Sequence, residues 1–161
     1  MNIIFIFMNI IRCFCMSTNP SQMNTDYLNN VEYDDTIPYI PELTHGKVVK
    51  VYDGDTITIA SQLPGSSTLY RFSIRLAGID TPEIKSHNPV EKERAIYVRN
   101  QLHDLLFGKI ICLTNISMEK YGRVLADIYL DDLHVNEYMI RQKYAYKYNG
   151  GKKQIYTEFT T

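Results

Sequence analysis

The chain has 161 residues, of which 45% are hydrophobic and 22% are charged, and its formal net charge is −1. That composition fits one globular domain with a sizeable core, and it excludes collagen-like, fully disordered and polytopic membrane proteins. Three Cys residues are too few for a disulfide framework, so hydrophobic packing must hold the fold together.

Charge is distributed unevenly along the chain. Residues 44–153 contain 16 Lys and Arg against 12 Asp and Glu, whereas residues 1–43 contain one Arg and five acidic residues. A mildly basic domain behind an acidic leader suits an anionic ligand, although an excess of this size is also common on ordinary protein surfaces.

The first 16 residues form an apolar leader. The run of about 14 residues from Ile3 to Met16 is shorter than the ~20 residues of a comfortable bilayer span. Three interpretations remain open: an export signal, a short membrane anchor, or upstream translation before a start at Met16 or Met23. Membrane contact is expected only through residues 3–16. The protein is secreted or membrane-anchored if they act as a signal or anchor, and soluble and intracellular otherwise.

Residues 17–43 are polar, rich in Asn, Asp and Ser, and end near two prolines. This composition is typical of a flexible acidic leader, so the domain is expected to begin at Thr44. We expect the domain to cover residues 44–153 and to be followed by a tail of residues 154–161, which has no helical pattern.

Five segments of the domain are predicted as short β-strands, because apolar and polar residues alternate in them or apolar residues run together. Turn residues separate them, and Asp53-Gly54-Asp55 predicts a hairpin between the first two. In chain order the predicted strands are Gly46–Val51, Thr56–Ile59, Thr68–Leu76, Lys109–Ile116 and Arg123–Leu130.

The main helix is predicted between the third and fourth strands. Asn88 is a candidate N-cap, Pro89 suits the first turn, and Glu91 stands three residues after the cap, as in a capping box. Apolar residues follow at helical spacing until Gly108, which can end the helix. A second, short helix is predicted with Asn136 as its cap. The element order predicts a mainly-β α+β fold, a five-stranded Greek-key barrel of the OB type with packed α-helices.

Three polar clusters lie at the ends of these elements: Asp53-Gly54-Asp55-Thr56, Arg75 to Glu83, and Glu119 to Arg123. The first two supply four carboxylates from turns, and hard divalent cations take such oxygen ligands together with backbone carbonyls. Either cluster alone is more simply turn and helix-entry chemistry. Together with Arg75 and Arg123, whose planar guanidinium groups match phosphate oxygens, the clusters predict a metal-assisted phosphate site.

The same motifs closely resemble the staphylococcal nuclease (thermonuclease) family over about residues 44–153. The resemblance rests on VYDGDT at 51–56, RLAGIDTPE at 75–83, EKYGRVLADIY at 119–129 and VNEYMIRQKYA at 135–145. It implies an OB-fold barrel and a calcium-dependent, sugar-nonspecific nuclease that hydrolyses DNA and RNA to 3′-phosphate products. DNA and RNA are the expected substrates, a monomer is expected, and no protein partner is implied.

The resemblance implies a metal site as well. Asp55 and Asp80 match the calcium carboxylates of the family, and Thr81 matches the residue that offers its backbone carbonyl. Asp53 matches a nearby acid that shapes the metal pocket without being a firm ligand.

Three further residues match catalytic positions of the family. Glu83 matches the acid that positions the attacking water, and Arg75 and Arg123 match the two arginines that grip the scissile phosphate. Tyr146 and Tyr148 stand where the family places aromatic residues near the bound nucleotide, and Tyr rings can stack bases without reading sequence.

A catalytically silent module that binds nucleic acid or peptides is the alternative function, because relatives of this fold in multidomain proteins act in that way after losing catalytic residues. Here both Asp, the Glu and both Arg are retained, so the sequence favours the enzyme.

Overall fold

The structure is a computed structural model that describes residues 25–119 and 122–151. The chain divides into two compact units, residues 1–37 and residues 38–161. In the first unit, the described residues form two short 3-10 helices, Asp26–Leu28 and Tyr33–Asp35, with every side chain exposed. The predictions for residues 3–16 and for the tail lie outside the described residues. Within the described part of the chain, no helix has the length and apolar character needed to cross a membrane.

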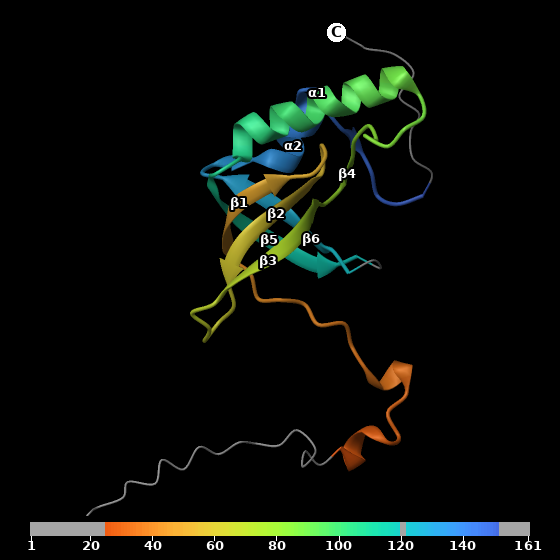
Figure 1. Ribbon diagram of the computed structural model, residues 1–161, viewed down its shortest axis with the longest axis vertical. Coiled ribbons are helices and arrows are strands. Elements are labelled where there is room, and N and C mark those ends of the chain that lie inside the picture. Colours follow the sequence, from red (N-terminus) through yellow and green to blue (C-terminus); the bar gives the residue numbers. More distant parts are fainter. Residues whose placement is uncertain (1–24, 120–121, 152–161) are drawn as a thin grey trace, which may run out of the picture. The chain divides into compact units, whose positions relative to one another are not determined.

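The second unit is a closed β-barrel of five long strands, seen in the centre of Figure 1. Neighbouring strands pair in the order β3-β2-β1-β5-β6 and are antiparallel, and a parallel pairing of β3 with β6 closes the barrel. The predicted α+β, OB-type barrel with packed helices is confirmed. The strands are β1 His45–Val51, β2 Thr56–Gln62, β3 Leu69–Leu76, β5 Ile110–Met118 and β6 Val124–Leu130.

The barrel core is filled from both the strands and the main helix. Alternate strand residues such as Ile57, Ile74 and Ile128 are fully buried, as the period-2 pattern requires. Helix α1, Pro89–Leu106, lies across one end of the barrel (Figure 1). Its buried residues, spaced by three or four positions, are Ala95, Val98, Leu102 and Leu106.

The start of α1 agrees with the predicted cap. The Asn88 side-chain oxygen accepts a hydrogen bond of 3.0 Å from the Val90 N–H, with Pro89 at the first helical position. Glu91 does not close a capping box. Its carboxylate instead accepts a hydrogen bond of 2.5 Å from the Ser86 hydroxyl, in the loop that precedes the helix.

The second helix, α2, spans Val135–Arg141, and the prediction that Asn136 caps it is wrong. Asn136 is buried inside the first turn. Its side-chain oxygen accepts a hydrogen bond of 3.0 Å from the Ile128 N–H, and its nitrogen donates to the carbonyl oxygens of Ala77 at 2.9 Å and Ala126 at 3.2 Å. These backbone groups lie where β3 and β6 end their parallel pairing, so Asn136 joins the ends of the two strands.

Short strands complete the unit. β7, Leu133–His134, pairs with β6, while β4, Ile79–Asp80, and β8, Tyr146–Lys147, form a separate two-stranded sheet. β4 is absent from the predicted strands, because two residues are too few to show alternation. Leu43, which the sequence assigns to the leader, is buried in the core, so packed structure begins before Thr44.

Candidate active site

The turn between β1 and β2 places Asp55 inside the domain. The Asp55 carbonyl accepts a hydrogen bond of 2.8 Å from the Leu76 N–H, which fixes the turn to the end of β3. The Thr56 hydroxyl donates to Asp55 Oδ1 at 2.8 Å. Asp55 is therefore a buried carboxylate with a fixed backbone and one oriented oxygen.

Gly54 is required in this turn by close packing. A Cβ at this position would lie 2.6 Å from Val98 Cγ1 of α1 and 2.9 Å from Thr81 Oγ1. Both distances are shorter than real Cβ contacts, so any larger residue must push the turn away from α1 and from the loop that carries Thr81. Gly54 thereby sets the distance between the first two acidic clusters.

Replacing Gly54 by Ala is expected to destabilise the domain by about 1–3 kcal/mol, the usual cost of overpacking a filled core. Thermal unfolding of the full chain measures this. The matched control is the same substitution in a Val98→Ala background, where the clashing methyl group is gone and the cost of the added Cβ should shrink. Equal costs in both backgrounds would show that the predicted clash does not limit the turn.

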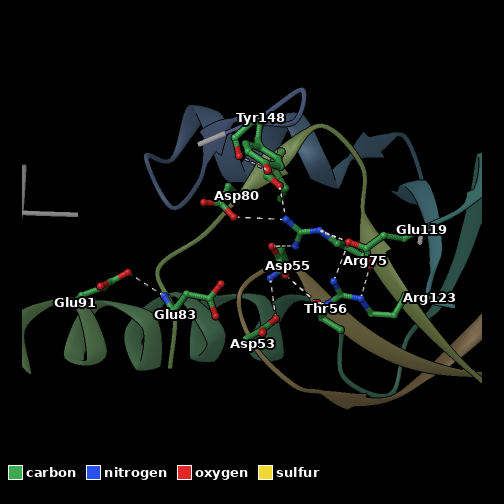
Figure 2. Close-up of polar contacts among 12 residues, drawn as sticks. Asp53, Asp55, Thr56, Arg75, Asp80, Glu83, Glu91, Glu119, Arg123 and Tyr148 are labelled. Atoms are coloured by element: carbon green, nitrogen blue, oxygen red, sulfur yellow. Dashed lines mark hydrogen bonds and ion pairs between the residues drawn. The ribbon is translucent and has the colours of Figure 1, made fainter. Parts of the chain in front are cut away.

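Arg75, at the end of β3, is the centre of the polar contacts that Figure 2 shows. It is buried, and its guanidinium donates to Asp55 Oδ2 and, at 3.2 Å, to the carbonyl of Ile79. Asp80 Oδ1 lies 3.5 Å from Arg75 Nη2. One guanidinium thus contacts carboxylates from two distant turns, and the predicted residues Asp55, Arg75 and Asp80 are brought together.

Arg123 joins the same cluster through Glu119. Arg123 donates to the two Glu119 oxygens at 2.6 and 2.9 Å, and Arg75 Nε lies 3.9 Å from Glu119 Oε1. Arg123 Nη1 is also 3.5 Å from the Thr56 hydroxyl oxygen, which itself contacts Asp55. Glu119 was not predicted as a site residue, although it stands in the third polar cluster, four residues before Arg123. The structure makes it the residue that holds both arginines side by side.

The loop after β4 carries the remaining predicted residues. Asp80 and Thr81 are buried, whereas Glu83 is exposed. Glu91 of α1 accepts a hydrogen bond of 3.4 Å from the Glu83 N–H (Figure 2), so the helix restrains the backbone of this loop. Glu83 also lines a cavity of about 330 Å³ together with Arg123. The acid and the second arginine therefore face the same space.

The two predicted tyrosines, Tyr146 and Tyr148, lie near Asp80 and Arg75. Tyr148 lines a cavity of about 490 Å³ together with Arg75 and Glu119, and its N–H donates to the carbonyl of Gly78 at 2.8 Å. Tyr146, in β8, pairs directly with Asp80 in β4. Both tyrosines are thus next to the arginine-carboxylate cluster, and Tyr148 shares a cavity with it.

The donor set fits a hard cation. Asp55 and Asp80 are buried carboxylates that both form ion pairs with Arg75, and Thr81 follows Asp80 directly in the chain. Burial raises the pKa of nearby Asp53, and the Glu83 charge adds to that rise, against the opposing effects of the Thr56 hydrogen bond and the arginines. Within residues 25–119 and 122–151, no three or more His, Cys, Asp or Glu side chains are arranged so that they alone could hold a metal ion. Calcium takes six to eight oxygen ligands, so an ion held by the Asp55 and Asp80 carboxylates would need water or phosphate oxygens to complete its coordination.

Comparison with known proteins identifies the family of the chain. The family described as Staphylococcal nuclease homologue matches residues 73–160, which is more than half of the chain. The chain belongs to the staphylococcal nuclease family. The matched range includes Arg75, Asp80, Thr81, Glu83 and Arg123, while Asp55 lies before it and joins the site through its contact with Arg75.

Individual relatives are similar over different shares of their length. An uncharacterized endonuclease of Escherichia coli is 32% identical over 105 residues, which cover 65% of this chain and 61% of that protein. An uncharacterized protein of Methanocaldococcus jannaschii is 31% identical over 84% of this chain and 75% of its own length. A staphylococcal-like nuclease of Arabidopsis thaliana is 35% identical over 78 residues, only 22% of that protein. The similarity to the Arabidopsis protein is thus confined to a small part of that protein. This chain also matches less than two thirds of the length of the E. coli relative.

Proposed function

We propose that this member of the staphylococcal nuclease family is a calcium-dependent nuclease that hydrolyses phosphodiester bonds of both DNA and RNA to 3′-phosphate products. The observation that carries the proposal is the convergence of Arg75, Arg123 and two buried carboxylates at the end of the barrel. The nuclease names of several relatives support the same reaction class.

The carboxylates of Asp55 and Asp80 and the backbone carbonyl of Thr81 would hold the calcium ion. A bound calcium ion supplies positive charge beside the phosphate and a place for the attacking water. Arg75 already contacts both carboxylates, so these residues are gathered before any ion binds.

Arg75 and Arg123 bind the scissile phosphate in this proposal. Each guanidinium presents several N–H donors in a fixed plane. The Glu119 carboxylate contacts both guanidinium groups and so keeps them next to each other. Arginine stays protonated at neutral pH, so both residues stabilise negative charge and neither acts as an acid. Donors fixed in advance lower the barrier because they need no reorganisation as charge develops.

Glu83 orients the attacking water. It is exposed on a loop that Glu91 ties to α1, and it faces the cavity that Arg123 also lines. A carboxylate at this position accepts a hydrogen bond from water beside the phosphate. Its efficiency as a general base depends on how closely its pKa approaches the working pH.

Replacing Glu91 by Ala is expected to lower the cleavage rate about ten-fold. The Glu91 carboxylate accepts hydrogen bonds from the Ser86 hydroxyl and the Glu83 N–H, and without it the loop that carries Glu83 loses both. The matched control is Glu93→Ala, an exposed residue on the same helix. Initial rates on single-stranded DNA are measured for both. If both variants lose the same fraction of the cleavage rate, the effect comes from removing a negative charge from the helix and not from the loop contacts of Glu91.

Binding through phosphate and metal carries no base information, because base edges are not contacted. Tyr148 adds a stacking surface that accepts any base. We therefore expect cleavage of DNA and RNA strands of matched length, and mass spectrometry of the products identifies their ends. Cleavage of one nucleic acid only, or 5′-phosphate ends, would contradict the proposal. Strand binding without cleavage would favour the alternative binding module.

A further inference from the structure

A second cationic region lies beside the arginine-carboxylate cluster, in the 330 Å³ cavity that Glu83 and Arg123 line. The rest of its lining comes from the β1–β2 turn, the loop after Glu83 and helix α1, and consists of Tyr52, Asp53, Ile84, Lys85 and Arg99. Its volume falls within the range of about 300–1,000 Å³ that is typical of pockets for small ligands. The cavity is therefore large enough for one more phosphate group of a bound strand.

Lys85 and Arg99 share this cavity with Arg123 and with two carboxylates, those of Asp53 and Glu83. Within residues 25–119 and 122–151, neither side chain forms an ion pair with a carboxylate. The guanidinium of Arg99 donates only to the side-chain oxygen of the adjacent Asn100, at 2.8 and 3.2 Å. By contrast, Arg75 and Arg123 are both engaged by carboxylates. Among the three lining cations, Lys85 and Arg99 are thus the two that form no ion pair within the described residues.

Arg99 is also well positioned. It stands on α1 between two fully buried residues of that helix, Val98 and Leu102, so the packing of the helix on the barrel fixes its backbone. Groups on a packed helix are held more accurately than groups on a free loop. A further cation lies near the lining residue Tyr52, because the Lys50 Nζ is 5.6 Å from the centre of the Tyr52 ring.

We propose that this cavity binds the phosphate next to the scissile one on the same strand, with Arg99 and Lys85 as its cationic contacts. The inference rests on the proposed nuclease function and extends it from one phosphate to two. Phosphates follow one another about every 3.4 Å of axis along each strand of a duplex, so a strand held at Arg123 brings a neighbouring phosphate close by. Contacts to that phosphate set the register of the strand and add affinity without base preference.

Three dinucleotide substrates with one scissile bond test the proposal. One carries no terminal phosphate, one carries a 5′-phosphate and one carries a 3′-phosphate. For the unaltered chain, we expect kcat/KM to be about ten-fold higher for one of the two phosphorylated substrates, the effect of a single charge-assisted contact. The preferred end then shows on which side of the scissile bond the cavity lies.

In Arg99→Gln this preference should disappear, while the rate on the unphosphorylated dinucleotide stays the same. Lys85→Gln should reduce the preference. The matched control is Arg71→Gln, which removes an exposed charge near the start of β3 and should keep the full preference. The proposal is overturned if the terminal phosphate has no effect in the unaltered chain, or if Arg99→Gln retains the preference. Absence of cleavage of every dinucleotide and of long strands would instead contradict the nuclease function itself.

A binding measurement gives a second readout that does not require cleavage. In a Glu83→Gln background with calcium, the affinity for a thymidine decamer is followed by fluorescence anisotropy at several salt concentrations. Loss of one phosphate contact reduces the slope of log K against log salt by about 0.7 for a single strand. We expect that reduction for Arg99→Gln and none for Arg71→Gln, and equal slopes for the two would overturn the proposal.

Discussion

Replacement of Arg75 or Arg123 by Lys is expected to lower the cleavage rate about 100-fold or more, the usual effect of losing a fixed donor to developing charge. Lys keeps the positive charge but loses the planar fork, so it cannot hold the phosphate through two parallel hydrogen bonds. For the buried Arg75, Lys also avoids leaving Asp55 and Asp80 without a cation. Added calcium should not restore either rate.

Asp55→Asn provides the contrast to the arginine variants. It keeps the shape of a side chain that contacts both Thr56 and Arg75, but it removes one negative charge from the proposed calcium site. A hard cation then binds more weakly, so the rate should recover as the calcium concentration rises. Calcium titrations of the cleavage rate compare the three variants. Rescue of Arg75→Lys together with a calcium-independent Asp55→Asn would reverse the assigned roles of metal and phosphate contacts.

Replacement of Glu83 by Gln is expected to lower the rate by about 100- to 1,000-fold, as expected for removing a water-positioning group from a prepared site. Gln preserves the size of the side chain and removes its charge. Because Glu83 is exposed, the melting temperature should change little.

The calcium concentration for half-maximal rate should also change little in Glu83→Gln, since Glu83 is outside the proposed ligand set. Glu93→Gln, exposed on α1, is the matched control and should keep the full rate. A large rise in the calcium requirement of Glu83→Gln would instead make Glu83 a metal ligand.

Much of the fold could be predicted because the barrel strands and α1 obey simple periodicities. Residues such as Ile57 and Ile59 alternate with less buried neighbours, and the buried residues of α1 recur every three or four positions. Periodicity cannot detect β4 or β8, which have two residues each. It also cannot tell whether Asn136, at the start of a helix, caps that helix or bridges buried backbone groups.

The site was predictable in its residue types but not in its contacts. Arg75 and Glu119 are separated by 44 positions, and only closure of the barrel through β3 and β6 brings their turns together. The same holds for Glu91, predicted only as a capping-box residue, and for Arg99, which the sequence shows only as a polar residue of the helix. Their neighbours depend on how α1 lies against the barrel and the loop that carries Glu83.

In the proposed function, one calcium-dependent site cleaves the phosphodiester backbone. The most direct measurement follows cleavage of single-stranded DNA by the full chain with calcium, with excess chelator, and after calcium is restored. We expect rapid cleavage with calcium, loss of at least 100-fold in chelator and full recovery when calcium again exceeds the chelator. Equal cleavage in chelator, or no cleavage at any calcium concentration, would contradict the account.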